Sequence, residues 1–169
     1  MTEAEIRERL KAYRVDVAAL KGIQITLSKL KRELKREEDD TREVLAGAGA
    51  AKLTGMPGAH SIESKVETAA IKMIDEPTKE MLTIREQIAD AETRMTGVSE
   101  RVELVDAWLD ALTHEERYAV TGRVIDAKQW GRIQAEYETD AGRYVTVRTM
   151  SQWASRAMKK ICVAAENVI

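Results

Sequence analysis

Two long segments of the chain carry apolar residues at alternating spacings of three and four, and this pattern limits the fold more than any other feature. The first stripe runs from Ile6 to Leu27 and contains one polar residue, Gln24. The second runs from Met81 to Leu112 without a change of phase, although Gly97 lies within it. Such spacings keep side chains on one side of an α-helix and, when sustained, are typical of coiled coils. The sequence therefore predicts two long helices that each need a partner.

The partner of these helices can be the chain itself, a second subunit, or both. A helix of about 35 residues is about 50 Å long, too long for a small C-terminal domain to bury alone. We expect an antiparallel hairpin that also forms a homodimer, and a hairpin closed within one chain is the alternative. The dimer contacts are expected from seven apolar residues of the two stripes: Leu10, Val17, Leu20, Leu27, Ile88, Met95 and Val102.

The segment between the stripes begins with AGAGAAKLTGMPGAHS, residues 46–61. Its four glycines and one proline predict a flexible loop that ends the first helix. The segment is not a phosphate-binding loop, because Lys52 is not preceded by glycine, is followed by Leu53, and follows no predicted strand. After it, Ser61 is expected to cap a short helix that ends near Ile74.

Residues 113–169 change character, because bulky aromatic residues and short helical patterns replace the long stripes. Thr113 with Glu116 three residues later is a capping-box pattern, and it predicts a helix over residues 114–125. A second helix is expected over 128–138 and a third over 146–166, with a turn at TDAGRY between them. This order is typical of a helix-turn-helix. We therefore predict an all-α protein with a coiled-coil, dimerising region at 1–112 and a helix-turn-helix domain at 113–169.

Charge is distributed unevenly along this acidic chain, whose net charge is -2. Residues 143–169 carry five basic side chains and one acidic one. The last predicted helix contains Val145–Ile161, VTVRTMSQWASRAMKKI, in which Met150, Ala157 and Ile161 form an apolar face. The opposite face combines arginine, glutamine, serine and threonine, the side chains that bind base edges and phosphates in DNA.

DNA binding is therefore the function that the residues of this domain favour, with a solvated helix face as the alternative. The candidates for contact with bases are Arg148, Thr149, Ser151 and Gln152. The candidates for contact with phosphates are Lys128, Arg132, Arg143, Ser155, Arg156, Lys159 and Lys160.

Other classes of function find little support in the sequence. The HEER stretch, 114–117, lacks the second histidine of a zinc-protease helix, and the acidic pairs have no nucleophile or glycine-rich frame beside them. We therefore expect no catalysis, no metal and no cofactor. No apolar run approaches the roughly 20 residues of a membrane span. A single cysteine, Cys162, and a charged N-terminus fit a protein of the cytoplasm.

Two resemblances extend this interpretation. Residues 145–161 resemble the recognition helix of the sigma-factor domain, region four, that reads the −35 promoter element: Val145, Thr146, Gln152, Ala157 and Lys160 match that pattern. Residues 112–133 resemble the preceding part of the same domain, through Leu112, Glu116, Arg117, Val120, Arg123 and Ile133. The chain departs from the pattern at Val147-Arg148-Thr149 and has a longer turn, so the resemblance implies a helix-turn-helix but not a promoter sequence.

The order of parts along nearly the whole chain resembles the RinA/ArpU-type phage transcriptional regulators. This resemblance rests on a charged helix, an LTGMPGAHS loop, a heptad helix and a sigma-like helix-turn-helix. It implies a phage or prophage activator of late or packaging genes that acts in the cytoplasm of a bacterial host cell. Such a protein binds double-stranded DNA as a homodimer, with host RNA polymerase as a further candidate partner. A small terminase subunit that binds packaging-site DNA is one alternative. The other is a coiled-coil adaptor that binds polymerase or a host protein without DNA.

Overall fold

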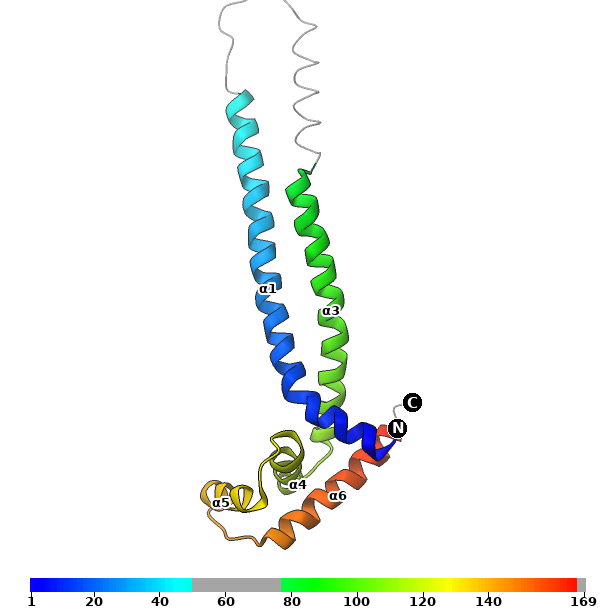
Figure 1. Ribbon diagram of the computed structural model, residues 1–169. Coiled ribbons are helices and arrows are strands. Elements are labelled where there is room, and N and C mark those ends of the chain that lie inside the picture. Colours follow the sequence, from blue (N-terminus) through cyan, green and yellow to red (C-terminus); the bar gives the residue numbers. More distant parts are fainter. Residues whose placement is uncertain (50–76, 167–169) are drawn as a thin grey trace, which may run out of the picture. The chain divides into compact units, whose positions relative to one another are not determined.

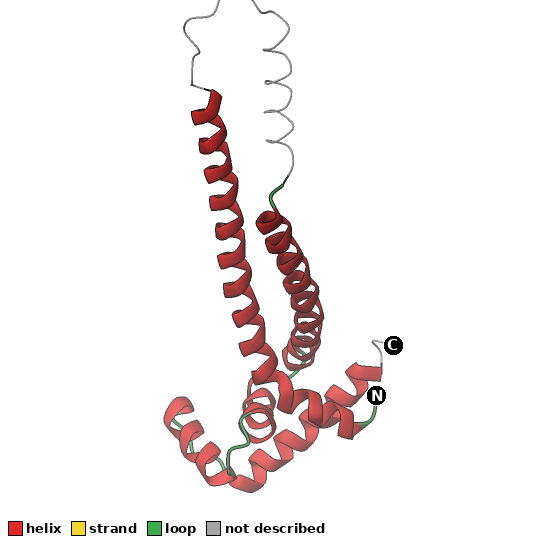
Figure 2. Cartoon of the chain, turned by 45° about the horizontal axis from the view of Figure 1, so that its top comes forward, coloured by secondary structure: helices red, strands yellow, loops and turns green. Residues whose placement is uncertain are grey.

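The protein is all-α. The computed structural model describes residues 1–49 and 77–166, which contain helices joined by short loops and no strand (Figures 1 and 2). The helices are α1 (Glu3–Gly49), α3 (Lys79–Asp110), α4 (His114–Val120), a π-helical turn η1 (Thr121–Ile125), α5 (Trp130–Ala141) and α6 (Val147–Glu166). The predicted fold class is confirmed. The predicted helix after Ser61 and most of the loop at 46–61 lie outside the described residues.

The described residues divide into two compact units, and the division cuts both long helices. The first unit contains Met1–Gly22 and Met95–Ile169, and the second contains Ile23–Arg94. The first 22 residues and residues 95–112 thus belong to the same unit as the predicted helix-turn-helix. Both long helices therefore supply side chains to the core that contains the C-terminal helices.

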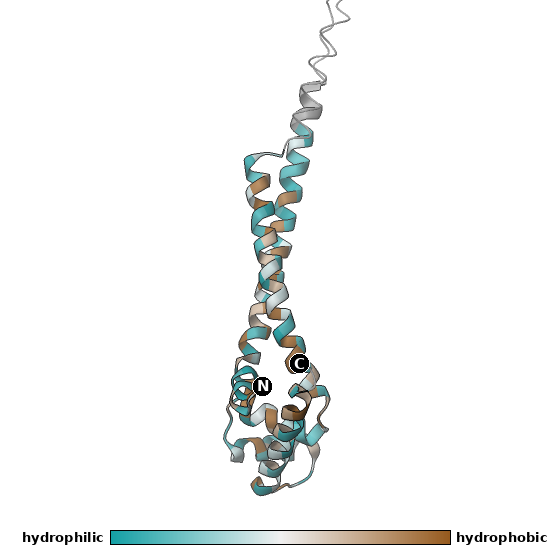
Figure 3. Ribbon diagram, turned by 90° about the vertical axis from the view of Figure 1, so that its right-hand side faces the viewer, coloured by the Kyte–Doolittle hydropathy of each residue, from teal (hydrophilic) through white to brown (hydrophobic). Residues whose placement is uncertain are grey.

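Helices α1 and α3 run antiparallel within each unit. In the first unit Tyr13 donates a hydrogen bond to Asp106 at 2.6 Å, and Arg101 pairs with Asp16 at 3.0 Å. In the second unit Lys31 pairs with Glu92, and Arg85 with Glu38. In both cases residues later in α1 meet residues earlier in α3, as in the predicted antiparallel hairpin. Hydrophilic and hydrophobic residues are interspersed along both helices (Figure 3).

The core of the first unit combines side chains from both ends of the chain. Ile6 and Leu10 of α1 are fully buried together with Trp108 of α3. Helices α4 and α6 pack against them, and the remaining buried members of this cluster are Val105, Leu109, Ala119, Val120, Ile125, Ala154, Ala157, Met158, Ile161 and Ala165. Since burial of an aliphatic side chain contributes about 1.5–3 kcal/mol, the N-terminus is an integral part of this core.

Local sequence sets the ends of the short helices. The predicted capping box of α4 is present: the Glu116 amide donates to Thr113 Oγ1 at 3.4 Å, and the Thr113 amide donates to Glu116 Oε2 at 3.1 Å. Thr2 and Glu5 form the same arrangement at the start of α1, which the sequence interpretation did not include. At the start of α3, the Met81 amide donates to Thr78 Oγ1 at 3.2 Å.

The predicted helix over residues 114–125 widens into a π-helical turn in its second half. The Asp126 amide donates to the Thr121 carbonyl at 2.8 Å, closing a wider ring than an α-helix allows. Gly122 lies in this turn, and a Cβ atom there would be 3.0 Å from Cγ1 of Ile133. The absence of a side chain thus lets α5 approach the turn closely.

The turn between α5 and α6 is fixed at both ends. Gly142 ends α5 in the left-handed conformation, with φ of 65°, which glycine adopts without a steric penalty. At the other end the Thr149 amide donates to Thr146 Oγ1 at 3.3 Å, so Thr146 caps α6. The small cluster of Ile133, Tyr137 and Met150 then holds α5 against α6.

Candidate nucleic-acid interface

Helix α6 has one buried and one exposed face, as its spacing predicts. Its buried residues are Met150, Ala154, Ala157, Met158, Ile161 and Ala165. Trp153 is half-buried and contacts the Tyr137 ring edge-on at a centroid distance of 5.6 Å. The opposite side, here called the outward face, consists of Arg148, Gln152, Ser155, Arg156 and Lys159, all exposed.

The four candidates for base contact lie in the first two turns of α6. Arg148, Ser151 and Gln152 are exposed, whereas Thr149 is half-buried and its hydroxyl lies 3.0 Å from that of Thr146. The Thr149 hydroxyl therefore already has a partner at the start of the helix. Arg148 and Gln152 are one turn apart on the outward face, with their side chains open to solvent.

Two of the candidates for phosphate contact are cations without a carboxylate partner among the described residues: Arg156 and Lys159. Both are exposed on the outward face, and Arg148 shares this property. Ser155 directly precedes Arg156, and its hydroxyl donates to the Ser151 carbonyl at 2.9 Å. The outward face therefore presents three positive charges that no described side chain neutralises.

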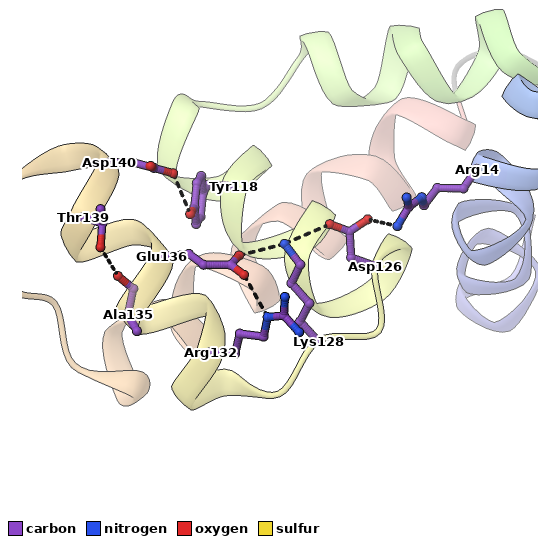
Figure 4. Close-up of polar contacts among 9 residues, drawn as sticks. All are labelled: Arg14, Tyr118, Asp126, Lys128, Arg132, Ala135, Glu136, Thr139 and Asp140. Carbon is purple, nitrogen blue, oxygen red and sulfur yellow. Dashed lines mark hydrogen bonds and ion pairs between the residues drawn. The ribbon is translucent and has the colours of Figure 1, made fainter.

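Lys128 and Arg132, two further phosphate candidates, are both bound to Glu136 (Figure 4). Lys128 Nζ donates to Glu136 Oε2 at 2.7 Å, and Arg132 Nε donates to Glu136 Oε1 at 2.9 Å. Asp126 lies 3.4 Å from the same Lys128 nitrogen and also pairs with Arg14. Hydrogen bonds from Lys128 and then Arg132 lower the pKa of Glu136. These two cations are therefore part of a network within the protein.

Arg143, in the turn before α6, is also held by its own chain. Its guanidinium donates to the Tyr137 hydroxyl at 2.7 Å through Nη2, and at 3.2 Å through Nε. Nη2 also donates to Glu115 Oε1 at 3.0 Å. Arg143 thus links the turn to α5 and α4, which is a positioning role within the fold.

Lys160 forms an ion pair with the most buried carboxylate of the described residues. Glu116 is 5% exposed, and Lys160 Nζ donates to its Oε2 at 2.7 Å. Burial raises the pKa of Glu116, but the hydrogen bonds from Lys160 and from the Thr113 amide outweigh this effect and hold the pKa below its usual value. Glu116, which belongs to the capping box of α4, thus also anchors the middle of α6 through Lys160.

A groove runs along one side of α6, where Ser151, Ser155 and Lys159 face Arg123 and Trp130. Its volume is 640 Å³, and the Arg123 guanidinium lies 5.6 Å from the centroid of the Trp130 ring. Arg123 also donates to the Lys128 carbonyl at 3.0 Å. The groove leaves Ser151 accessible from the side of α6 rather than from its outward face.

The predicted dimer contacts lie at different depths within one chain. Leu10 and Val102 are buried in the first unit and Leu27 in the second. Val17, Leu20, Ile88 and Met95 are half-buried. Burial of Leu10, Leu27 and Val102 therefore needs no second subunit.

The sequence interpretation missed the residues that restrain the cations. Glu115, Glu116 and Glu136 were not assigned a part in the site, although Glu116 was identified as a cap. The i,i+4 spacing of Arg132 and Glu136 is a signal that could have revealed one pair. The spacing of Lys160 from Glu116, 44 residues along the chain, carries no such signal.

Comparison with known proteins gave no match to a family model, a curated protein or a solved structure. In the described ranges 1–49 and 77–166, no helix is long and apolar enough to cross a membrane. The same residues contain no group of histidine, cysteine and carboxylate side chains that could hold a metal ion.

Proposed function

We propose that this protein binds double-stranded DNA in a sequence-specific manner through the outward face of α6 and regulates transcription. The setting we propose is a phage or prophage, with late or packaging genes as the targets. This part of the proposal is motivated by two resemblances. Residues 145–161 resemble a promoter-reading helix, and nearly the whole chain resembles RinA/ArpU-type regulators.

One observation supports DNA binding above the rest: three exposed cations without a carboxylate partner among the described residues gather on one face of α6. These cations are Arg148, Arg156 and Lys159. Five other cations of residues 113–166 pair with carboxylates, and Arg123 donates to the Lys128 carbonyl. If α6 served only to pack against the core, its cations would keep the protein soluble whether or not carboxylates were bound to them. Positive charge that no carboxylate neutralises, on the same helix face as Gln152, suits DNA, whose phosphates are negative and whose base edges accept and donate hydrogen bonds.

In this proposal Arg148 and Gln152 contact base edges in the major groove, and Ser151 contacts a base from the side. Arginine binds guanine and glutamine binds adenine through paired hydrogen bonds. Arg156 and Lys159, two turns further along, contact phosphates. Lys128, Arg132, Arg143 and Lys160 contribute by holding the helices in place.

The proposal includes a homodimer, whose symmetry predicts an inverted-repeat binding site with half-sites about one helical turn apart or a multiple of it. Since Leu10 is covered by its own chain, dimer contacts are also expected from apolar residues of α1 that remain exposed, such as Val15. Sedimentation of the full chain at micromolar concentration tests this part. A monomer at that concentration would contradict it.

Selection from a pool of randomised duplexes with the full-length protein tests the central claim. We expect enrichment of one sequence, with binding by fluorescence anisotropy that weakens steeply as salt rises. The Arg148→Ala and Gln152→Ala variants should relax the preference at separate positions of the selected site. The proposal would be contradicted if no sequence were enriched and the protein bound no duplex at about 50 mM salt, where phosphate contacts are strong. A ring of subunits in sedimentation would instead favour a packaging protein.

A further inference from the structure

Tyr144 is the exposed aromatic side chain nearest the start of α6. It lies in the turn between α5 and α6, three residues before Val147, and is 67% exposed. The chain has four tyrosines. The hydroxyls of Tyr13, Tyr118 and Tyr137 hydrogen-bond to Asp106, Asp140 and Arg143 respectively.

The hydroxyl of Tyr144, by contrast, has no partner within the described part of the chain. A large ring left mostly in water contributes little to folding, because its apolar area is not removed from solvent. Neither packing nor a hydrogen bond of the fold therefore accounts for a tyrosine at this position.

The turn nevertheless holds Tyr144 in a defined place. On one side, Arg143 is fixed by hydrogen bonds to Tyr137 and Glu115. On the other, Val145 packs against the cluster of Ile133, Tyr137 and Met150, and Thr146 caps α6. Because its neighbours on both sides are anchored, the position from which the Tyr144 side chain projects is set by the fold.

If α6 enters the major groove, the position of Tyr144 determines which part of the DNA its side chain can contact. The N-terminal residues of a recognition helix meet base edges, so a residue just ahead of them lies over the adjoining sugar–phosphate strand. Tyrosine is among the side chains that donate hydrogen bonds to phosphate oxygens and fix the register of a protein on the duplex.

We infer that Tyr144 contacts the DNA backbone, with its hydroxyl donating to a phosphate oxygen beside the bases that Arg148 contacts. This inference rests on the proposed function. It adds a neutral contact to those of Arg156 and Lys159. A tyrosine releases no condensed counterion on binding, so its contribution to affinity does not depend on salt as that of a cation does.

Binding of full-length Tyr144→Phe and Tyr144→Ala to the selected duplex, across a series of salt concentrations, tests the inference. Loss of the hydroxyl should weaken binding about tenfold, since a hydrogen bond to a charged group is lost. Loss of the ring as well should weaken it further. The slope of log affinity against log salt should not change in either variant. Ethylation of one phosphate should interfere with binding by the wild type but not by Tyr144→Phe.

Val163→Ala is the matched control, because Val163 is 59% exposed on α6 but far from the turn. It should bind as the wild type does. Tyr144 variants with wild-type affinity and an unchanged ethylation pattern would overturn the Tyr144 contact alone. A wild-type protein that binds no duplex would overturn the proposed function as well.

Discussion

The seven basic residues predicted to contact DNA fall into two groups, which differ in the partners that the fold gives them. Lys128, Arg132, Arg143 and Lys160 are each bound to a carboxylate within the protein. Arg148, Arg156 and Lys159 have no such partner among the described residues. The two groups are chemically alike, and Lys159 and Lys160, one from each group, are adjacent in the sequence. The difference arises only where helices bring distant carboxylates together.

This comparison shows that a local excess of positive charge overstates the charge available to a ligand. A cation already bonded to a carboxylate offers a phosphate little net attraction, because the neighbouring negative charge opposes it. The free group is the part of the patch that can release counterions from DNA. We therefore expect variants of the paired cations to leave the salt slope of DNA binding unchanged, and variants of the free cations to lower it.

The largest effect is expected from Glu116→Ala, which removes the carboxylate that holds Lys160. This change also removes half of the capping box of α4. Loss of the cap costs about 1 kcal/mol, and loss of a hydrogen bond to a charged group costs about 1.5–3 kcal/mol. Urea unfolding should show a destabilisation of about 3 kcal/mol.

Glu116→Gln separates the two roles of this residue. Glutamine can still accept the bond from the Thr113 amide, so the capping box remains while the ion pair is lost. We expect roughly half the destabilisation of the alanine variant. Equal stability of wild type and Glu116→Ala would show that the pair with Lys160 contributes nothing to stability. It would contradict a structural role for this paired cation.

The next largest effect is expected from the double variant Arg156→Ala/Lys159→Ala. Removal of two phosphate contacts should lower the salt slope of DNA binding by about two and weaken affinity about 30-fold at 0.15 M salt. The melting temperature should stay the same, because both side chains are exposed. Fluorescence anisotropy with the selected duplex measures the first effect.

Lys21→Ala/Lys29→Ala is a matched control, since it removes two exposed cations of α1. This variant should keep the wild-type slope. If both double variants lower the slope equally, general charge rather than the outward face of α6 determines binding.

Much of the fold could be predicted because its signals are local. The apolar spacing from Met81 to Leu112 specifies a helix, and the Thr113–Glu116 box marks the start of α4. The buried face of α6 follows from the spacing of Met150, Ala157 and Ile161. Each of these depends on neighbours within a few turns, where periodicity and capping rules apply.

The rest depends on tertiary contacts that no spacing reports. The burial of Ile6 and Leu10 beside Trp108 assigns the N-terminus to the C-terminal core. The close approach of Ile133 to Gly122 depends on how α5 crosses the π-helical turn. The candidate site divides in the same way: the face of α6 was predictable, but the pairing of Lys160 with Glu116 was not.

A smaller effect is expected from pH. The pKa of Glu116 lies below its usual value of 4.5 in the folded protein, so the native state favours the ionised form. The stability from this shift is fully present above pH 4.5 and is lost as pH falls through the lower, folded-state pKa. The difference in unfolding free energy between wild type and Glu116→Gln should therefore shrink as pH falls from 7 to 3. A constant difference over this range would contradict an ionic role for the Lys160 pair.

The smallest effect is expected from Arg132→Ala, and this variant tests the division between the two groups most directly. Arg132 is exposed, and its bond to Glu136 is an ion pair one helical turn away in the sequence. Exposed pairs of this kind contribute little, so the melting temperature should change by less than about 2 °C. The salt slope of DNA binding should not change, because Glu136 already compensates the Arg132 charge and Lys128 remains beside it. A slope that falls by about one would show that Arg132 leaves Glu136 for a phosphate when DNA binds. The paired cations would then contact phosphates in the complex and would not serve only to hold the helices together.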